Sequence, residues 1–196
     1  MGMCLGLCSI GAPNLQRVLA DPPLVWRVIA PDDPEMYETA RPKNGLFKKW
    51  FGNKDGAAED LVLGEGEAQN ADLDKAWHGI HYLLTGTAYE GEGPVSYLLA
   101  GGQEVGDIDV GYGPVRALTP SEVQDFRRAI AGLSVEDLRA RFNPEEMMEL
   151  GIYPDIWDRD PAEDDTLAYC LEYFKTLRDF VDAAASKNQG LLIYLS

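Results

Sequence analysis

The sequence predicts an α+β fold, a single domain in which a small mixed sheet packs against several helices. Apolar segments typical of strands occur at residues 2–10 and 190–195, near the two ends of the chain. The segments between them show no regular βαβ alternation, so we expect these two strands to pair directly in the sheet. With 196 residues and 45% hydrophobic content, the chain can bury one core. We therefore expect one domain over residues 1–196.

The first part of the chain is expected to hold one strand, short helices and a surface excursion. Residues 2–10 are apolar on both faces, which is typical of a central strand, and Pro13 can begin a helix over residues 14–20. Prolines punctuate the next region, where only residues 24–30 show a helical pattern, so most of it is predicted to be loop. A shift in composition at about residues 43–70 indicates a surface excursion.

A helix over residues 72–86 is the segment on which the other elements are expected to pack. Asp72 is a suitable N-cap, and Gly86 can adopt the left-handed conformation that ends a helix. One broad face of this helix is apolar and should lie on the core, with Trp77 near its middle. That face comprises Leu73, Ala76, Trp77, Ile80, Leu83 and Leu84.

The second part of the chain is expected to be mainly helical. Residues 95–100 read as a buried strand, the glycine-rich residues 101–114 as solvated turns, and residues 115–118 as a short strand. Helix-capping patterns occur at Thr119, Ser134 and Asn143. The longest helix is predicted over residues 166–186, where leucine, phenylalanine and valine form one apolar stripe.

Several long motifs resemble one known family. They are the opening MGM, the segment LDKAWHGIHYLLTG at 73–86, GYGPVRALTP at 111–120, IYPDIW at 152–157 and the closing strand. By these motifs the chain is identified as a member of the YfbM-like family of bacterial proteins of unknown function. The resemblance covers almost the whole chain. It implies no activity, because that family offers no catalytic residue to carry over to this sequence.

Composition excludes several classes of partner. A net charge of −16 argues against nucleic acid and anionic membrane surfaces, because proteins that bind either concentrate lysine and arginine. The N-terminal apolar segment is too short and too rich in glycine for a targeting signal. Three cysteines, an odd number, indicate a reducing compartment rather than a disulfide framework. We expect a cytoplasmic protein with no cofactor.

The two histidines of the protein define a candidate catalytic site. On a helix over residues 72–86, Asp74, His78 and His81 project from one edge. His78 or His81 could act as general acid or base, with Asp74 orienting His78. The alternative is that both histidines are structural and bonded to a neighbouring loop. A metal site is not predicted, because the three-residue spacing differs from the zinc-protease pattern.

Four aromatic side chains are candidates for binding a partner. Trp77 and Tyr82 lie on the central helix, and Phe47 and Trp50 flank two lysines in the excursion. Exposed aromatic residues beside lysine are typical anchors, although aromatic residues of the excursion could instead attach it to the body of the domain. The leading hypothesis is a non-enzymatic protein-binding or inhibitory module. The alternative is a small-ligand binder or hydrolase-like enzyme that uses the His/Asp edge of the central helix.

Overall fold

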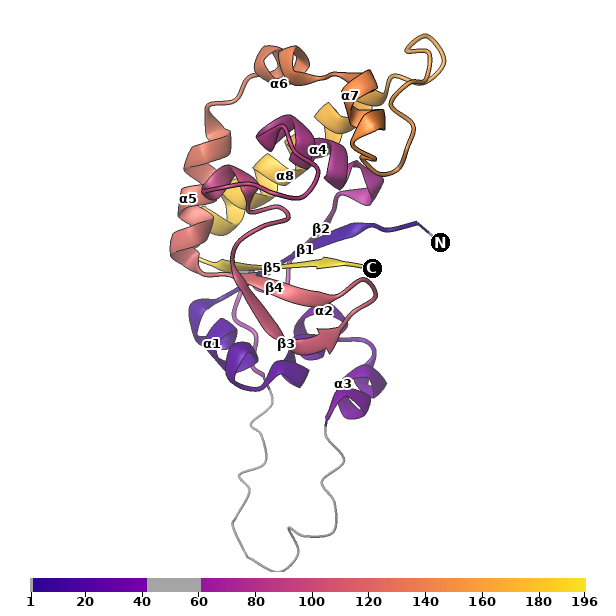
Figure 1. Cartoon of the computed structure of the whole chain (residues 1–196). Coiled ribbons are helices and arrows are strands. Elements are labelled where there is room, and N and C mark those ends of the chain that lie inside the picture. The colour runs from indigo at the N-terminus through magenta and orange to yellow at the C-terminus, as the bar shows by residue number, and fades with distance from the viewer. Residues whose placement is uncertain (1, 42–60) are drawn as a thin grey trace, which may run out of the picture.

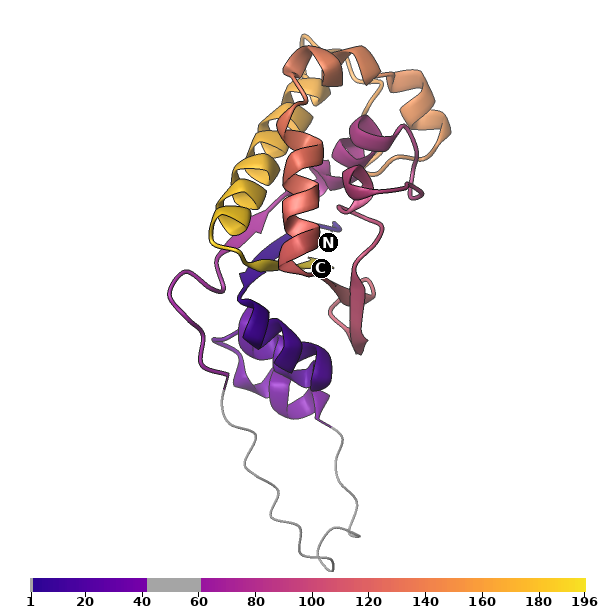
Figure 2. The same ribbon diagram turned by 90° about the vertical axis from the view of Figure 1, so that its left-hand side faces the viewer.

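A five-stranded sheet lies between two layers of helices (Figures 1 and 2). The structure is a computed structural model that describes residues 2–41 and 61–196. The strand order is β2-β1-β5-β4-β3, and each pairing in the sheet is antiparallel. The strands are β1 (Leu5–Ile10), β2 (Asn70–Asp72), β3 (Gln103–Asp109), β4 (Pro114–Leu118) and β5 (Gly190–Leu195). The α+β class and the single domain are confirmed, and the sheet is antiparallel rather than mixed.

The two terminal strands are neighbours, as the sequence predicted. In β1 and β5, Leu5 pairs with Leu195 and Ile10 pairs with Gly190. The chain ends also meet, because the backbone N–H of Cys4 donates to the carbonyl of Ser196 at 2.9 Å. Both strands carry apolar side chains on both faces, which suits their place in the middle of the sheet.

The helices divide between the two faces of the sheet (Figure 1). One face is covered by α1 (Ala12–Ala20), η1 (Pro22–Val25), α2 (Trp26–Ile29) and α3 (Pro34–Ala40). The other layer contains η3 (Asp74–Ala76), α4 (Trp77–Thr85), η4 (Pro94–Ser96), α5 (Pro120–Ala131), α6 (Val135–Arg141), α7 (Pro144–Glu149) and α8 (Thr166–Ser186). Among residues 2–41 and 61–196, no helix is long and apolar enough to cross a membrane.

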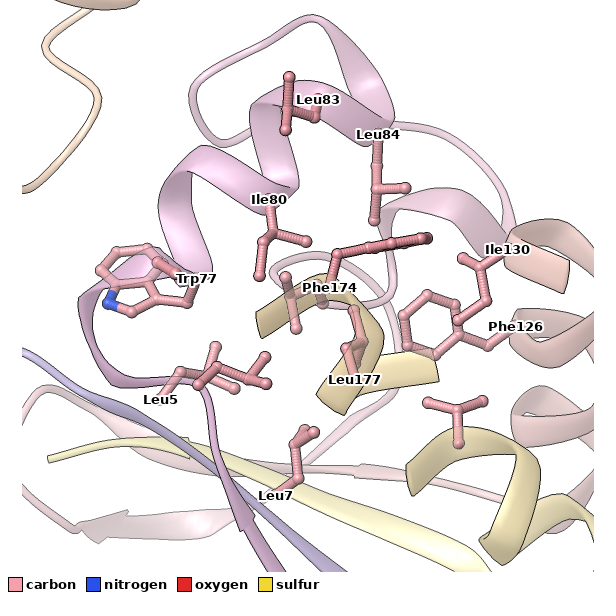
Figure 3. Packing of buried hydrophobic residues seen from close by; sticks show 14 of the residues in the cluster. Leu5, Leu7, Trp77, Ile80, Leu83, Leu84, Phe126, Ile130, Phe174 and Leu177 are labelled. Atoms are coloured by element: carbon pink, nitrogen blue, oxygen red, sulfur yellow. The ribbon is translucent and has the colours of Figure 1, made fainter. Parts of the chain in front are cut away.

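Each face of the sheet has its own hydrophobic core, because alternate side chains of a strand point in opposite directions. Leu5 and Leu7 of β1 pack under α4, α5 and α8, whereas Cys8 packs under the first helices of the chain. Figure 3 shows the larger core, in which Ile80 of α4 faces Phe174 of α8. The apolar face predicted for the central helix is therefore the buried face.

Helix caps predicted from local sequence patterns are present in the structure. Thr119 and Ser134 each form the predicted capping box, and the side chain of Asn143 accepts from the N–H of Glu146 at 3.3 Å. The longest helix, α8, spans Thr166–Ser186, as predicted. These caps depend on residues three apart in sequence, so they need no tertiary information.

Two predictions for residues 95–109 were wrong. Residues 95–100 are not a strand: they follow Pro94 through the turn η4, and the carbonyl of Ser96 accepts from the N–H groups of Leu99 and Ala100. Residues 103–109, predicted to be turns, form the edge strand β3. An edge strand with one covered face carries few apolar residues, so its pattern resembled a polar loop.

The start of the central helix and the loop before it also differ from the prediction. Asp72 is not the N-cap of an α-helix but the last residue of β2, where it pairs with Gly6. Its carboxylate accepts from the N–H of Asp74 at 2.7 Å, a 3₁₀ turn follows, and α4 begins at Trp77. Gly86 ends the helix at φ 76°, as predicted.

Two expected loop regions contain regular structure. Pro34–Ala40, in the proline-rich region predicted to be mostly loop, forms α3, because Asp33 accepts from the N–H of Glu35 and Pro34 suits a first turn. Residues 42–60 lie outside the described residues, and they include most of the excursion expected at about residues 43–70. Its last residue, Asn70, already belongs to the sheet.

Candidate functional site

His78 is fully buried on α4, and both of its ring nitrogens are bonded to the backbone. The N–H of Tyr153 donates to Nδ1 at 2.9 Å, so Nδ1 carries no proton. Nε2 therefore carries the proton and donates to the carbonyl of Ala88 at 2.7 Å. Burial lowers the pKa of His78, although the bond to Ala88 acts in the opposite direction. A general acid or base must reach its substrate, so this geometry favours a structural role.

His81 lies one turn further along α4 and is also fully buried. Its Nε2–H donates to the carbonyl of Glu90 at 3.1 Å, and within the described residues Nδ1 has no hydrogen-bond partner. Burial lowers the pKa of His81 to about 4. The two imidazoles therefore hold the loop that follows α4 against the helix, in their neutral form.

Asp74 does not join the histidines. It lies in η3 with a left-handed φ of 44°, which breaks the helical spacing that the sequence suggested. Its carboxylate accepts from the hydroxyl of Tyr169 at 2.8 Å and from the thiol of Cys4 at 3.5 Å. Because both nitrogens of His78 are bonded elsewhere, Asp74 does not orient that ring.

The aromatic candidates of the central helix are also buried. Trp77 is 2% exposed; its indole N–H donates to the carbonyl of Met3 at 3.0 Å, and its ring stacks on His78 with centroids 4.7 Å apart. Tyr82 is 3% exposed, and its hydroxyl donates to the Glu146 carboxylate at 2.7 Å. The other two candidates, Phe47 and Trp50, lie outside the described residues.

A hollow opens beside Trp77, at the end of the sheet where β5 finishes. We call it the sheet-end hollow, and its volume is about 240 Å³. The first residue of β1 and the last residues of β5 line it, and Trp77 and Leu99 come from the layer with α4. Neither histidine lines it. The residues that matter most for its chemistry are Trp77, Tyr89, Glu104, Tyr112 and Arg116.

Two tyrosines of the sheet-end hollow reach solvent. Tyr89, in the loop after α4, is 60% exposed, and its ring lies on the buried imidazole of His78 with centroids 4.7 Å apart. Tyr112, in the turn between β3 and β4, is 51% exposed. The carboxylate of Asp109 shapes that turn, because it accepts from the N–H groups of Gly111 and Gly113. The backbone of Tyr112 is also joined to β5, because its N–H donates to the carbonyl of Leu195 at 3.2 Å.

Arg116 of β4 is the cation of the sheet-end hollow. Its guanidinium donates to three backbone carbonyls, those of Tyr97 at 3.4 Å, Leu98 at 2.5 Å and Gly101 at 2.9 Å. Burial lowers the pKa of Arg116 to about 10, and the charge of Glu104 partly opposes this. Glu104 is the cross-strand neighbour of Arg116 and is exposed.

Sequence reasoning did not find Tyr89, Tyr112, Glu104 or Arg116. A local signal exists, because each tyrosine lies in a glycine-rich, acidic segment, AYEGEG at 88–93 and DVGYGP at 109–114. A large aromatic residue has no core to enter from such a loop. The two segments are separated by more of the chain than any local pattern spans, and they meet at one hollow only in the folded structure.

In two other pockets, several of the charged side chains already have partners. A pocket of about 480 Å³ contains Asp74, Lys75 and Arg159, but Asp74 binds Tyr169 and Arg159 lies 2.5 Å from Asp164. Between α5 and α8, a pocket of about 400 Å³ is lined by an Arg–Asp ion pair. Within residues 2–41 and 61–196, no group of three or more His, Cys, Asp or Glu side chains could hold a metal ion.

The fold is that of a class of proteins whose function is unknown. Over residues 1–194 the chain matches the family described as Domain of unknown function (DUF1877), and it belongs to this family. The crystal structure of YfbM from Escherichia coli, a protein of unknown function, is similar to it with a TM-score of 0.65 and 15% identity. The match covers 98% of this chain and 99% of that chain. The YfbM-like resemblance is thereby confirmed, and the shared feature is the fold. No curated protein matches the chain.

Proposed function

We propose that the protein is a non-enzymatic protein-binding module whose contact surface is centred on the sheet-end hollow. One observation carries this proposal. Six large apolar side chains are exposed among the described residues, and two of them, Tyr89 and Tyr112, line this one hollow. Tyrosine is enriched at the energetic centres of protein interfaces, because it brings a large apolar area and a polar tip at a low cost in side-chain entropy.

The charges around the sheet-end hollow define the kind of partner. Glu90 and Glu92 follow Tyr89 and are exposed, Glu104 lines the hollow, and Asp109 lies in the turn that holds Tyr112. In a chain with a net charge of −16, these carboxylates favour a basic protein partner and disfavour nucleic acid. If that partner is an enzyme with a basic active site, binding would inhibit it.

An enzyme built on the His/Asp edge has less support. Both imidazoles are fully buried and bonded to backbone carbonyls, and Asp74 is turned toward Tyr169. Cysteine chemistry has no better basis, because burial raises the pKa of Cys8 to about 12. All three cysteines are free thiols, which supports the cytoplasmic location that forms part of this proposal.

The proposal is tested by capture of partners from the organism that encodes the protein. The immobilised full chain is compared with Tyr112→Ala and with Leu150→Ala, a matched control because Leu150, at the C-cap of α7, is 42% exposed and does not line the hollow. We expect the parent and Leu150→Ala to retain the same basic protein and Tyr112→Ala to lose it. Retention should also fall as salt is raised. Equal retention by all three proteins would place the contact surface elsewhere.

A further inference from the structure

Arg116 is half-buried, and protein acceptors among the described residues occupy only part of its guanidinium. In the described part of the chain, it forms no ion pair, and its three contacts are all to carbonyls. A guanidinium has five N–H donors, so the Nε–H and one Nη2–H are left without a protein acceptor among these residues. Nε and Nη2 lie on one side of the guanidinium, and together they match the two oxygens of a carboxylate.

The walls around Arg116 are apolar and aromatic. Leu5, Leu99 and Leu195 line the hollow together with Tyr89 and Tyr112, and Glu104 is the one acidic residue among the described residues of the lining. The volume of the hollow is about 240 Å³. Pockets for drug-sized ligands have volumes of roughly 300–1,000 Å³, so this hollow suits a single amino-acid residue better than a cofactor.

We propose that the sheet-end hollow binds the carboxyl-terminal residue of a partner polypeptide, with an apolar side chain between Tyr89 and Tyr112 and the terminal carboxylate on Arg116. This inference rests on the proposed function and names what the partner inserts. A terminal residue is the one place in a polypeptide where a carboxylate and a large apolar side chain share the same α-carbon. Capture of a terminal carboxylate is a recurrent mode of peptide recognition.

The acidic rim specifies the residues that precede the terminal one. Glu104 lies across the strand from Arg116, and Glu90 and Glu92 follow Tyr89, so carboxylates surround the entrance. They disfavour an internal aspartate or glutamate of an acidic segment and favour lysine or arginine upstream of the terminal residue. The expected ligand is therefore a basic tail that ends in an apolar residue.

The test measures fluorescence anisotropy of a labelled hexapeptide with the full chain. The peptide has three lysines, two glycines and a terminal phenylalanine, and it is made with a free carboxylate and as the carboxamide. We expect the free acid to bind about tenfold more tightly, or more, because a charge-assisted hydrogen bond to arginine is lost in the amide. Equal binding of the two peptides overturns the inference.

Variants separate the carboxylate contact from the apolar contact. Arg116→Gln should abolish the preference for the free acid, and Arg116→Lys should retain part of it because the charge remains. If loss of the three carbonyl contacts unfolds Arg116→Gln, then Arg116→Lys and Tyr112→Ala carry the test. Tyr112→Ala should weaken both peptides about equally, and Leu150→Ala should change neither. A preference for the acid that survives in Arg116→Gln overturns the inference.

The remaining outcomes distinguish this inference from the proposed function. If acid and amide bind equally and both are lost in Tyr112→Ala, the binding surface stands and the terminal-carboxylate site falls. The same conclusion follows if neither peptide binds while a basic protein is captured by the parent and lost by Tyr112→Ala. If selective binding of the acid depends on Arg116 but no protein is captured, the terminal-carboxylate site stands and the basic protein partner of the proposed function falls.

Discussion

His81 should make the stability of the protein fall between neutral and mildly acidic pH. The imidazole is completely buried, and its Nδ1 has no hydrogen-bond partner in the described structure. A second proton on Nδ1 would therefore have no acceptor. Its Nε2–H is already committed to the carbonyl of Glu90. Protonation would therefore place a positive charge in an apolar site beside Arg116, whose own charge also lowers the pKa of His81.

The size of the effect follows from the two pKa values. In the unfolded chain His81 has a pKa near 6.5, whereas burial lowers it to about 4 in the folded protein. Above pH 6.5 both states are neutral and the folded protein keeps its full stability. Below that pH the unfolded chain takes up a proton that the folded protein does not bind until about pH 4. At about 1.4 kcal/mol for each pH unit, the free energy of unfolding should fall by about 3 kcal/mol across this window.

Urea unfolding measured at several pH values from 7.5 to 4 tests this expectation. The matched variant is His81→Gln, whose amide can still donate to the carbonyl of Glu90 but does not titrate. We expect the parent to lose more stability than the variant over this window, while His78, whose pKa is also lowered by burial, contributes in both proteins. Asp109 and Asp137 have lowered pKa values, so their contribution is lost only at lower pH. Parallel pH profiles of parent and variant would refute the reasoning.

Three further substitutions test the packing of α4 by urea unfolding. Trp77→Ala should lower the free energy of unfolding by about 3–5 kcal/mol, because the side chain is 2% exposed. A variant as stable as the parent would contradict the placement of Trp77 in the core. Gly79→Ala should cost about 1–3 kcal/mol, because its Cβ would lie 2.4 Å from Trp157 and 2.7 Å from the sulfur of Cys170; an unchanged midpoint would contradict this. Gly86→Ala should cost about 1 kcal/mol from φ 76° alone, since no atom lies within 4 Å of its Cβ; a cost near zero would show that the helix end relaxes.

The sequence by itself determined the features that depend on near neighbours. The capping boxes at Thr119 and Ser134, the bounds of α8 and the left-handed end of α4 at Gly86 all follow from residues within one or two turns. The apolar periodicity of α4 correctly identified its core face. The pairing of the terminal strands could also be predicted, because both are apolar on two faces and must be covered on both.

Tertiary structure decided the roles of the polar residues. A helical wheel placed Asp74 beside His78, but a left-handed residue at the start of η3 turns the carboxylate toward Tyr169 of α8. The wheel could show that two histidines share an edge, but not that a loop would cover that edge and bond to both rings. The hydrogen-bond partners of a buried polar group come from distant segments, so residue type and spacing alone cannot supply them.

The sheet-end hollow also depends on tertiary structure alone. Its two exposed tyrosines come from a loop after α4 and from a turn between β3 and β4, and its cation comes from β4. The residue pattern of the edge strand β3 resembles that of a loop, so no local signal places Glu104 across from Arg116. Strand pairing places Glu104 across from Arg116, and the folded loop after α4 adds Tyr89. These segments are distant in the chain, so only the tertiary structure brings their side chains to one hollow.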